Sequence, residues 1–308
     1  MTPSYQQGRF LAATIESVLS QEGDFVIDYV ICDGGSKDES VEVIKRYEAM
    51  LKAGTWPIRC GGITYRWLSE KDRGQTDAIS KGFAMTTGSV LAWLNSDDTY
   101  MPGALQRVAA VFADPNVSVV YGKSHFTDEA GNIIGKYPTE PFDVDRLPVF
   151  NFISQPSTFF TKAALEAAGG LEVDLHFVMD FDLWIRLAKQ FAFTYVPEFL
   201  STWRLHDDSK TVSPASALAN HKEMLDTVTK YFGWSPLNRV YSYTYQLLKA
   251  KLPMLREREL SLVALSVPFA AANYLRMNRG VRLADLKLVT RTNLRKLFMT
   301  PVEISKEY

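Results

Sequence analysis

The stretch VLAWLNSDDTYMPG, residues 90–103, sets an apolar run directly against two adjacent acids. Residues 90–94 have the length and composition of a buried strand, and polar residues follow at once. Asp97 and Asp98 then lie where such a strand would leave the core, with no basic residue beside them in sequence. Because adjacent like charges repel, the stretch predicts that a cation from elsewhere neutralises the pair.

The segments around this stretch alternate between helical and strand patterns. Leu11, Ile15 and Val18 share one helical face, and residues 25–31 (FVIDYVI) have the composition of a strand. The order of helices and strands up to residue 121 predicts an α/β fold, a mostly parallel sheet with helices on both faces. No strand is predicted before the first helix, so the first strand of the sheet is expected to be missing or truncated.

Past residue 121 the pattern changes. We expect a hairpin over 126–134, a strand over 158–160, a helix over 181–190, a strand over 193–196, and helices from 215 to 308. This organisation predicts a catalytic domain over residues 1–212 and a helical C-terminal region over 213–308.

Bulk composition narrows the functional class. The chain has 308 residues and a formal net charge of −1, which gives no support for a nucleic-acid partner. Two cysteines, Cys32 and Cys60, are too few for a disulfide framework and are typical of a reducing cytoplasm. The start of the sequence has no signal-peptide pattern. The apolar run 261–275 contains Pro268 and falls short of the ~20 residues that span a bilayer.

Polar clusters follow three of the predicted strands. They are Asp33–Ser36, Ser69–Gly74 and residues 95–98. Each cluster alone is explained by turn formation, since Asp, Gly and Ser are turn formers. Because ligands of open α/β sheets bind beyond the carboxyl ends of the strands, all three together predict a binding site.

The acid pair suits Mg²⁺ or Mn²⁺, hard cations that prefer oxygen ligands and usually share their coordination with substrate phosphates. The alternative is that Asp98 or Thr99 caps the helix that follows Pro102. Capping requires one residue, so it leaves the second acid unexplained.

Seven segments, in order, resemble the family 2 glycosyltransferases, which have the GT-A fold. They are TPSYQQGRFLAATIESVLSQ (2–21), DGGSKDES (33–40), DRGQTDAISKGF (72–83), LAWLNSDDTYMPGAL (91–105), QPSTFF (155–160), MDFDLWIRL (179–187) and RLHDDSKT (204–211). The resemblance implies an inverting, metal-dependent enzyme that transfers a sugar from a nucleotide diphosphate sugar to an acceptor hydroxyl. It also implies a saccharide or lipid-linked acceptor, as in bacterial surface polysaccharide or glycolipid synthesis.

The resemblance assigns roles to particular residues. Asp180 takes the position of the family's general base, with helix capping as its alternative role. Asp97 and Asp98 take the metal and ribose positions of the acidic motif, and their two roles are not separated. The remaining donor-binding positions are Thr2, Pro3 and Asp33 around the nucleoside, Asp72 and Arg73 in the donor loop, and Arg204 and His206 near the diphosphate.

Three residues depart from the family pattern. Asn95 stands where many members have a first Asp, and Gly34 replaces a second Asp common after the strand. Met179 replaces the Glu that precedes the base. These departures keep a non-catalytic nucleotide-sugar binding module open as an alternative. A nucleotidyltransferase is the other alternative, but its phosphate loop would need a basic residue, and none precedes Arg9.

The C-terminal region is rich in basic residues. Residues 249–296 contain eleven Lys or Arg and three acids, around the apolar run 261–275. A basic, apolar helical segment of this kind can rest on an anionic membrane surface, here the inner face of the cytoplasmic membrane. The alternative is a helical cap that packs on the catalytic domain or on a second subunit of a homo-oligomer.

Overall fold

The computed structural model describes residues 1–206, 216–255, 258–282 and 285. The chain divides into two compact units, which are treated separately below. The first unit is Met1–Phe142 with Phe152–Leu205, and the second is Asp143–Asn151 with His206–Tyr308. The first unit thus ends at Leu205, and the expected boundary at 212/213 lies outside the described residues. Residues 143–151 join the helical unit, where Asn238 donates to the carbonyl of Val149 (2.8 Å).

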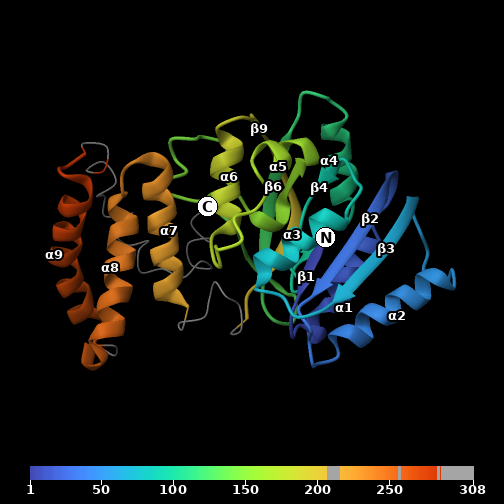
Figure 1. The fold of residues 1–308 in the computed structure, drawn as a ribbon, viewed down its shortest axis with the longest axis horizontal. Coiled ribbons are helices and arrows are strands. Elements are labelled where there is room, and N and C mark those ends of the chain that lie inside the picture. The colour runs from blue at the N-terminus through green and yellow to red at the C-terminus, as the bar shows by residue number, and fades with distance from the viewer. Residues whose placement is uncertain (207–215, 256–257, 283–284, 286–308) are drawn as a thin grey trace. The chain divides into compact units, whose positions relative to one another are not determined.

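The first unit contains a three-stranded parallel sheet. Its order is β1 (Thr2–Ser4), β2 (Gly23–Asp33) and β3 (Cys60–Ser69), with β2 and β3 adjacent in Figure 1. The expectation that no strand precedes the first helix is therefore wrong. With three residues, β1 is too short to show the alternation that identifies a strand.

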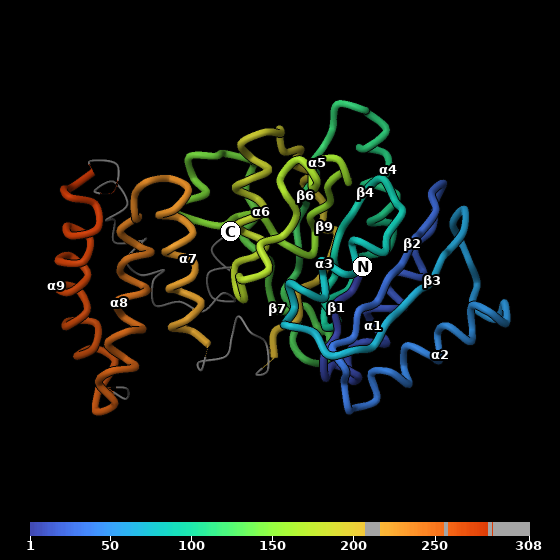
Figure 2. Tube along the Cα trace, viewed as in Figure 1, coloured from blue at the N-terminus to red at the C-terminus, as the bar shows by residue number. Residues whose placement is uncertain are grey.

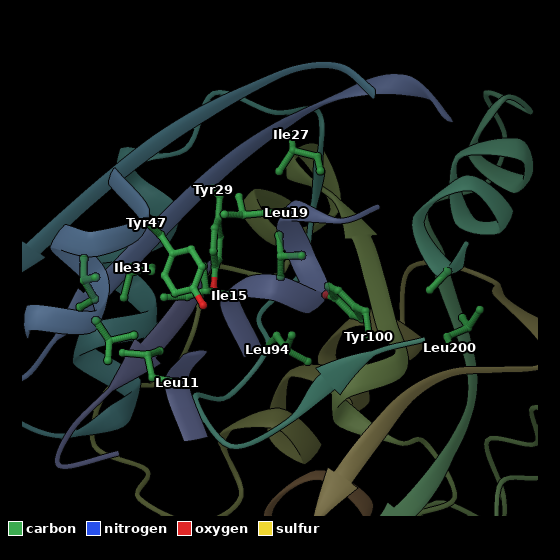
Figure 3. Packing of buried hydrophobic residues seen from close by; sticks show 14 of the residues in the cluster. Leu11, Ile15, Leu19, Ile27, Tyr29, Ile31, Tyr47, Leu94, Tyr100 and Leu200 are labelled. Carbon is green, nitrogen blue, oxygen red and sulfur yellow. The ribbon is translucent and has the colours of Figure 1, made fainter. Parts of the chain in front are cut away.

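Helices cover both faces of this sheet, as expected. Alternate side chains of β2 point to opposite faces. Ile27, Tyr29 and Ile31 pack with α1 (Gly8–Leu19) and α2 (Ser40–Lys52), as the close view in Figure 3 shows. On the other face Val30 and Cys32 pack with Ala78 of α3 (Gln75–Met85).

A second, mixed sheet completes the first unit, in addition to the parallel sheet expected from the sequence. Only β6 and β9 pair in parallel, and the other neighbours are antiparallel. The predicted hairpin is confirmed, since β7 pairs with β6. The order is β4-β8-β6-β9-β5, with β4 (Val90–Leu91), β5 (Thr99–Tyr100), β6 (Val119–Thr127), β7 (Ile133–Lys136), β8 (Thr158–Thr161) and β9 (Phe193–Arg204).

The apolar run at residues 90–94 makes backbone hydrogen bonds with both sheets. Val90 and Leu91 pair with β8 of the mixed sheet. The next residues lie beside the start of β1, because the Met1 amino group donates to the carbonyl of Ala92 (2.9 Å) and Leu94 N–H donates to the carbonyl of Met1 (3.0 Å). This arrangement delivers residues 95–98 to the carboxyl edge of the parallel sheet.

The remaining helices belong to both units. The first unit has α4 (Ala104–Phe112), α5 (Lys162–Ala167) and α6 (Met179–Ala188), with a 3₁₀ turn at Gln155–Ser157. In the second unit α7 (Ala217–Phe232), α8 (Leu237–Lys251) and α9 (Glu259–Asn278) pack in sequence order, as Figure 2 shows, with a 3₁₀ turn at Pro253–Leu255. The described part of the C-terminal region is helical, as expected.

Helix α9 corrects one expectation. It continues through Pro268 and extends beyond the apolar run at both ends, to 20 residues. Among the described residues, α9 is the one helix that is long enough and apolar enough to cross a membrane, judged by length and composition alone. Of its most apolar 18-residue stretch, 22% is buried.

Candidate functional site

The three polar clusters meet at one edge of the parallel sheet. Ser69 Oγ, at the end of β3, donates to Asp33 Oδ2 at the end of β2 (2.6 Å). Gln75, which follows the second cluster, donates through Nε2 to Asn95 Oδ1 of the third (2.8 Å). The convergence expected from strand order is therefore present.

Asp33 is enclosed by its own turn. Asp33 is only 1% exposed. Oδ2 accepts from the N–H groups of Gly35 (3.1 Å) and Ser36 (2.9 Å) as well as from Ser69, and Oδ1 accepts from Ser36 Oγ (2.5 Å). With both oxygens engaged, Asp33 organises the turn after β2, and its predicted contact with the nucleoside stays a prediction.

In the β1 segment, the residues predicted to bind the nucleoside are buried, and other residues lie at the edge. Thr2 is fully buried and its hydroxyl is hydrogen-bonded to Tyr29 Oη (2.8 Å), while Pro3 is buried in the strand. Ser4 and Tyr5, which the sequence analysis did not select, lie at the edge. Ser4 Oγ is buried with no hydrogen-bond partner among the described residues, and Tyr5 is 61% exposed. An orphaned hydroxyl beside an exposed ring fits a ligand site.

Asp72 and Arg73 begin the loop that leads into α3. Asp72 Oδ1 accepts from Gly74 N–H (2.9 Å), and Gly74 adopts a φ of 120°, in the region that favours glycine. The Arg73 side chain is 75% exposed and pairs with Asp77 (3.0 Å). The hydrogen bond from Arg73 is the main reason why the pKa of Asp77 lies below its ordinary value.

Asp97 and Asp98 occupy different environments. Asp98 is 1% exposed, and Asp97 is half-buried. Asp98 Oδ1 accepts from Arg204 N–H (3.0 Å) and Oδ2 accepts from Asn95 Nδ2 (3.3 Å). Burial, and then the charge of Asp97, raise the pKa of Asp98 well above its ordinary value. Asp98 is thus part of the protein interior, and Asp97 is the member of the pair nearer to solvent.

Arg204 lies against this pair and uses its donors locally, so its predicted approach to the donor diphosphate stays a prediction. Nε donates to the carbonyl of Asp97 (2.9 Å) and Nη1 to the carbonyl of Glu129 (2.7 Å). The guanidinium therefore fixes the backbone of the acidic loop. His206 is buried and belongs to the second unit, so its approach to the donor diphosphate stays a prediction.

Asn95 and Gln155 form a network that the sequence analysis missed. Asn95 Nδ2 donates to Gln155 Oε1 (3.1 Å), and Gln155 Nε2 donates to the carbonyl of Trp93 (2.7 Å). The same Asn95 amide donates to Asp98, so the amide supplies a donor where an Asp would add a further negative charge. The QPSTFF segment contained Gln155, but an uncharged side chain gives no titratable signal.

Asp180 is half-buried in the first turn of α6. Helix α6 begins at Met179, after Val178 at the N-cap position, and Asp180 Oδ1 accepts from the N–H of Phe181 (2.7 Å) in its first turn. The alternative role of Asp180 in satisfying the helix start therefore stays open beside its predicted role as the base. The loop before α6 is tied to the start of α3 by Thr76 Oγ1, which donates to the carbonyl of Leu175 (2.6 Å). Asp182, by contrast, is buried and pairs with Arg186 (2.7 Å).

The acids at this edge suit a metal ion that is bound jointly by the protein and a substrate phosphate, rather than by protein ligands alone. The described residues contain no group of three or more His, Cys, Asp or Glu that could hold a metal by themselves. Mg²⁺ and related ions are commonly bound through one or two carboxylates together with substrate phosphates. Asp97, beside Asp98, meets that requirement.

A family model identifies the protein family of the chain. The model described as Glycosyl transferase family 2 matches residues 1–167, which is more than half of the chain. The chain belongs to glycosyl transferase family 2. The matched segment of this family 2 protein includes the edges of β1, β2 and β3 and the acid pair.

Comparisons with individual proteins agree with the family 2 assignment. The chain is 21% identical over 260 residues to chondroitin synthase of Escherichia coli, covering 81% of this chain but 36% of that one, so it spans about a third of that relative. Mannosyltransferase PcManGT from Pyrobaculum calidifontis, in complex with GDP-Man and Mn²⁺, has a TM-score of 0.56 at 17% identity, with 98% of this chain and 81% of that one covered. S. aureus TarS 1-349 in complex with UDP has a TM-score of 0.53 at 14% identity, with coverages of 91% and 88%. These likenesses confirm the predicted GT-A fold.

Proposed function

We propose that this family 2 protein is an inverting glycosyltransferase that moves a sugar from a nucleoside diphosphate sugar to an acceptor hydroxyl. The observation that carries the proposal is the acidic loop. It sets a half-buried Asp97 beside an enclosed Asp98, at the edge where the loops after β2 and β3 meet. Solved proteins of the same fold bind the nucleotide sugar GDP-Man in one case and the nucleoside diphosphate UDP in another.

We assign the two acids different roles. Asp98 has both oxygens engaged by Arg204 and Asn95, so it holds the loop in place. Asp97 holds Mn²⁺ or Mg²⁺ together with the donor diphosphate. When bound, the ion stabilises the negative charge that develops on the leaving diphosphate.

Asp180 is the general base in this proposal. An attacking acceptor hydroxyl must lose its proton to a positioned group as the new glycosidic bond forms. The first turn of α6 favours the ionised carboxylate, because the helix N-terminus carries a partial positive charge. The neutral Met179 that precedes Asp180 leaves the helix geometry intact.

Thermal shift tests donor binding. Nucleoside diphosphate sugars with Mn²⁺ are expected to raise the Tm of the wild-type chain, and the donors alone to raise it less. A nucleotidyltransferase would instead release pyrophosphate from a nucleoside triphosphate. A binding module would show the Tm shift but release no nucleoside diphosphate with any acceptor.

The second unit suggests what kind of acceptor the protein uses. Helix α9 buries one stripe (Leu262, Ser266, Ala270, Tyr274) and exposes another that is also apolar (Leu260, Ala264, Val267, Ala271, Leu275). Exposed basic residues accompany it at Arg258, Arg276 and Arg279. An apolar stripe with cations beside it suits the interface of an anionic membrane. We therefore propose a lipid-linked acceptor and peripheral attachment to the cytoplasmic face.

Sedimentation with vesicles tests the attachment. The wild-type chain should pellet with anionic vesicles and less with neutral ones, and Val267→Asp should reduce pelleting. Ala219→Asp, an equal change at an exposed position of α7, is the matched control. If pelleting is independent of lipid charge and of Val267→Asp, the membrane proposal is wrong. Loss of a dimer in Val267→Asp would show instead that a second copy covers the stripe.

A further inference from the structure

The carboxylate of Asp72 fills the space that a side chain at position 34 would occupy. A Cβ built on Gly34 would lie 2.7 Å from Asp72 Oδ2 and 3.1 Å from Tyr5 Cδ2. A separation of 2.7 Å is shorter than a normal contact, so a side chain at position 34 would require the Asp72 carboxylate to move. The position where many relatives have a second acid after β2 is therefore served by an acid from the loop after β3.

Asp72 is held so that one of its oxygens is available. Oδ1 accepts from Gly74 N–H (2.9 Å), which fixes the side chain. Among the described residues, no hydrogen-bond donor reaches Oδ2. Asp33, the neighbouring acid, has both oxygens engaged by its own turn and by Ser69. At this corner of the edge, Asp72 is thus the carboxylate that can accept a hydrogen bond from a ligand.

The surroundings of Oδ2 suit a flat heterocycle. Tyr5 is 61% exposed, and its ring edge lies beside the same Gly34 position. The absence of a side chain on Gly34 leaves room for the Asp72 carboxylate beside the Tyr5 ring. An exposed aromatic ring next to a single acceptor provides stacking and one directional hydrogen bond.

On the basis of the proposed function, we infer that Asp72 selects the donor base by accepting a ring N–H through Oδ2. An ionised carboxylate only accepts hydrogen bonds. Uracil offers a donor at N3, whereas cytosine presents an acceptor there and would face the carboxylate lone pair. Guanine offers two neighbouring donors, which need two acceptor oxygens in register, and Oδ1 is already held by Gly74. The structure therefore favours a uridine diphosphate donor.

Asp72→Asn tests the inference because it keeps the shape and the Oδ1 acceptor for Gly74 while replacing Oδ2 with a donor. We expect isothermal titration of the full chain with Mn²⁺ to show UDP binding weakened ~10–100-fold, the range for an unpaired polar group, and CDP binding strengthened. Glu70→Gln is the matched control, since Glu70 lies in the same loop, is exposed and pairs with Lys81 (2.8 Å). It removes the same charge and should leave the UDP-to-CDP ratio unchanged.

Moving the carboxylate from position 72 to position 34 gives a second test. Asp72→Ala alone should weaken UDP binding, and adding Gly34→Asp should restore part of it, because the new side chain enters the space that Asp72 leaves and supplies a carboxylate from the other loop. Equal UDP affinity in wild type and Asp72→Asn, without gain for CDP, would overturn the inference. Absence of binding of any nucleoside diphosphate to the wild-type chain would contradict the proposed function instead, so the two failures are distinguishable.

Discussion

Trp93 stacks on Trp184 with ring centroids 5.5 Å apart and planes inclined by 20°. Trp93 lies two residues before Asn95 in the acidic loop, and Trp184 lies one helical turn after Asp180 in α6. Phe160 of β8 packs against both rings, at 6.1 Å and 6.0 Å. This buried aromatic cluster therefore links the strand that carries the acid pair to the helix that carries the proposed base.

Truncation of Trp184 should lower the stability of the protein. Trp184→Ala is expected to lower the free energy of unfolding by about 3–5 kcal/mol, because it leaves a cavity in a close-packed cluster. Trp184→Phe should cost less, since Nε1 of Trp184 has no hydrogen-bond partner among the described residues and no such bond is lost. Urea unfolding of the three proteins measures the difference. Equal stability of the alanine and phenylalanine variants would show that the stack does not hold α6.

The two acids of the loop should separate in a metal titration. Asp97→Asn is expected to abolish the additional Tm increase that Mn²⁺ gives in the presence of donor, because it removes the proposed ligand. Asp98→Asn should mainly lower the stability, by about 1–3 kcal/mol, since the hydrogen bonds with Arg204 and Asn95 are rearranged. Loss of the metal-dependent shift in Asp98→Asn alone would reverse the assignment.

Asp180 and Asp182 should also differ, although two positions separate them. Asp182→Asn removes the ionic partner of Arg186, whose side chain is 18% exposed and still donates to the carbonyls of Ala168 and Gly170, so we expect a loss of stability of about 1–3 kcal/mol. Asp180→Asn should leave stability nearly unchanged and reduce kcat by ~10²–10⁴, the usual contribution of a general base. Paired unfolding and activity measurements decide this. A stable Asp182→Asn together with a fully active Asp180→Asn would contradict the roles given to α6.

The Asp28 site predicts an acid-sensitive contribution to stability. Burial alone would raise the pKa of Asp28, but hydrogen bonds from Arg66 (2.5 Å) and from Thr87 outweigh it, so the pKa lies below its ordinary value. A carboxylate with a lowered pKa stabilises the fold fully above its unfolded-state pKa of about 3.9, and this contribution is lost as the pH falls through the lower folded-state pKa.

Denaturant unfolding of wild type and Asp28→Asn between pH 7 and pH 2 checks this sign. The stability advantage of the wild type should be constant above about pH 5 and shrink below about pH 4. An advantage that grows on acidification would mean that the pKa of Asp28 is raised instead.

Periodicity explains which elements were predictable. The apolar, β-branched and aromatic composition of residues 25–31 indicates β2, and the helical spacing of Leu11 and Ile15 indicates the helix after β1. Three residues of β1 carry no period, and alternation does not specify which neighbour a strand pairs with. The assignment of β4 and β6 to a mixed sheet was therefore missed.

The site was predictable as a location and less so in its details. Strand ends placed Asp33, Asp72 and Asp97 on one edge. The saturation of Asp33 by its own turn and the contact between Gly34 and Asp72 depend on backbone paths 38 residues apart in sequence, which no local pattern encodes.

Release of nucleoside diphosphate from a panel of nucleotide sugars, with Mn²⁺ and saccharide or lipid-linked acceptors, tests the central claim most directly. The account predicts acceptor-dependent release from at least one donor by the wild-type chain, lost in Asp97→Asn and strongly reduced in Asp180→Asn. Donor binding without release across the whole panel would contradict it and would show a binding module on a family 2 scaffold.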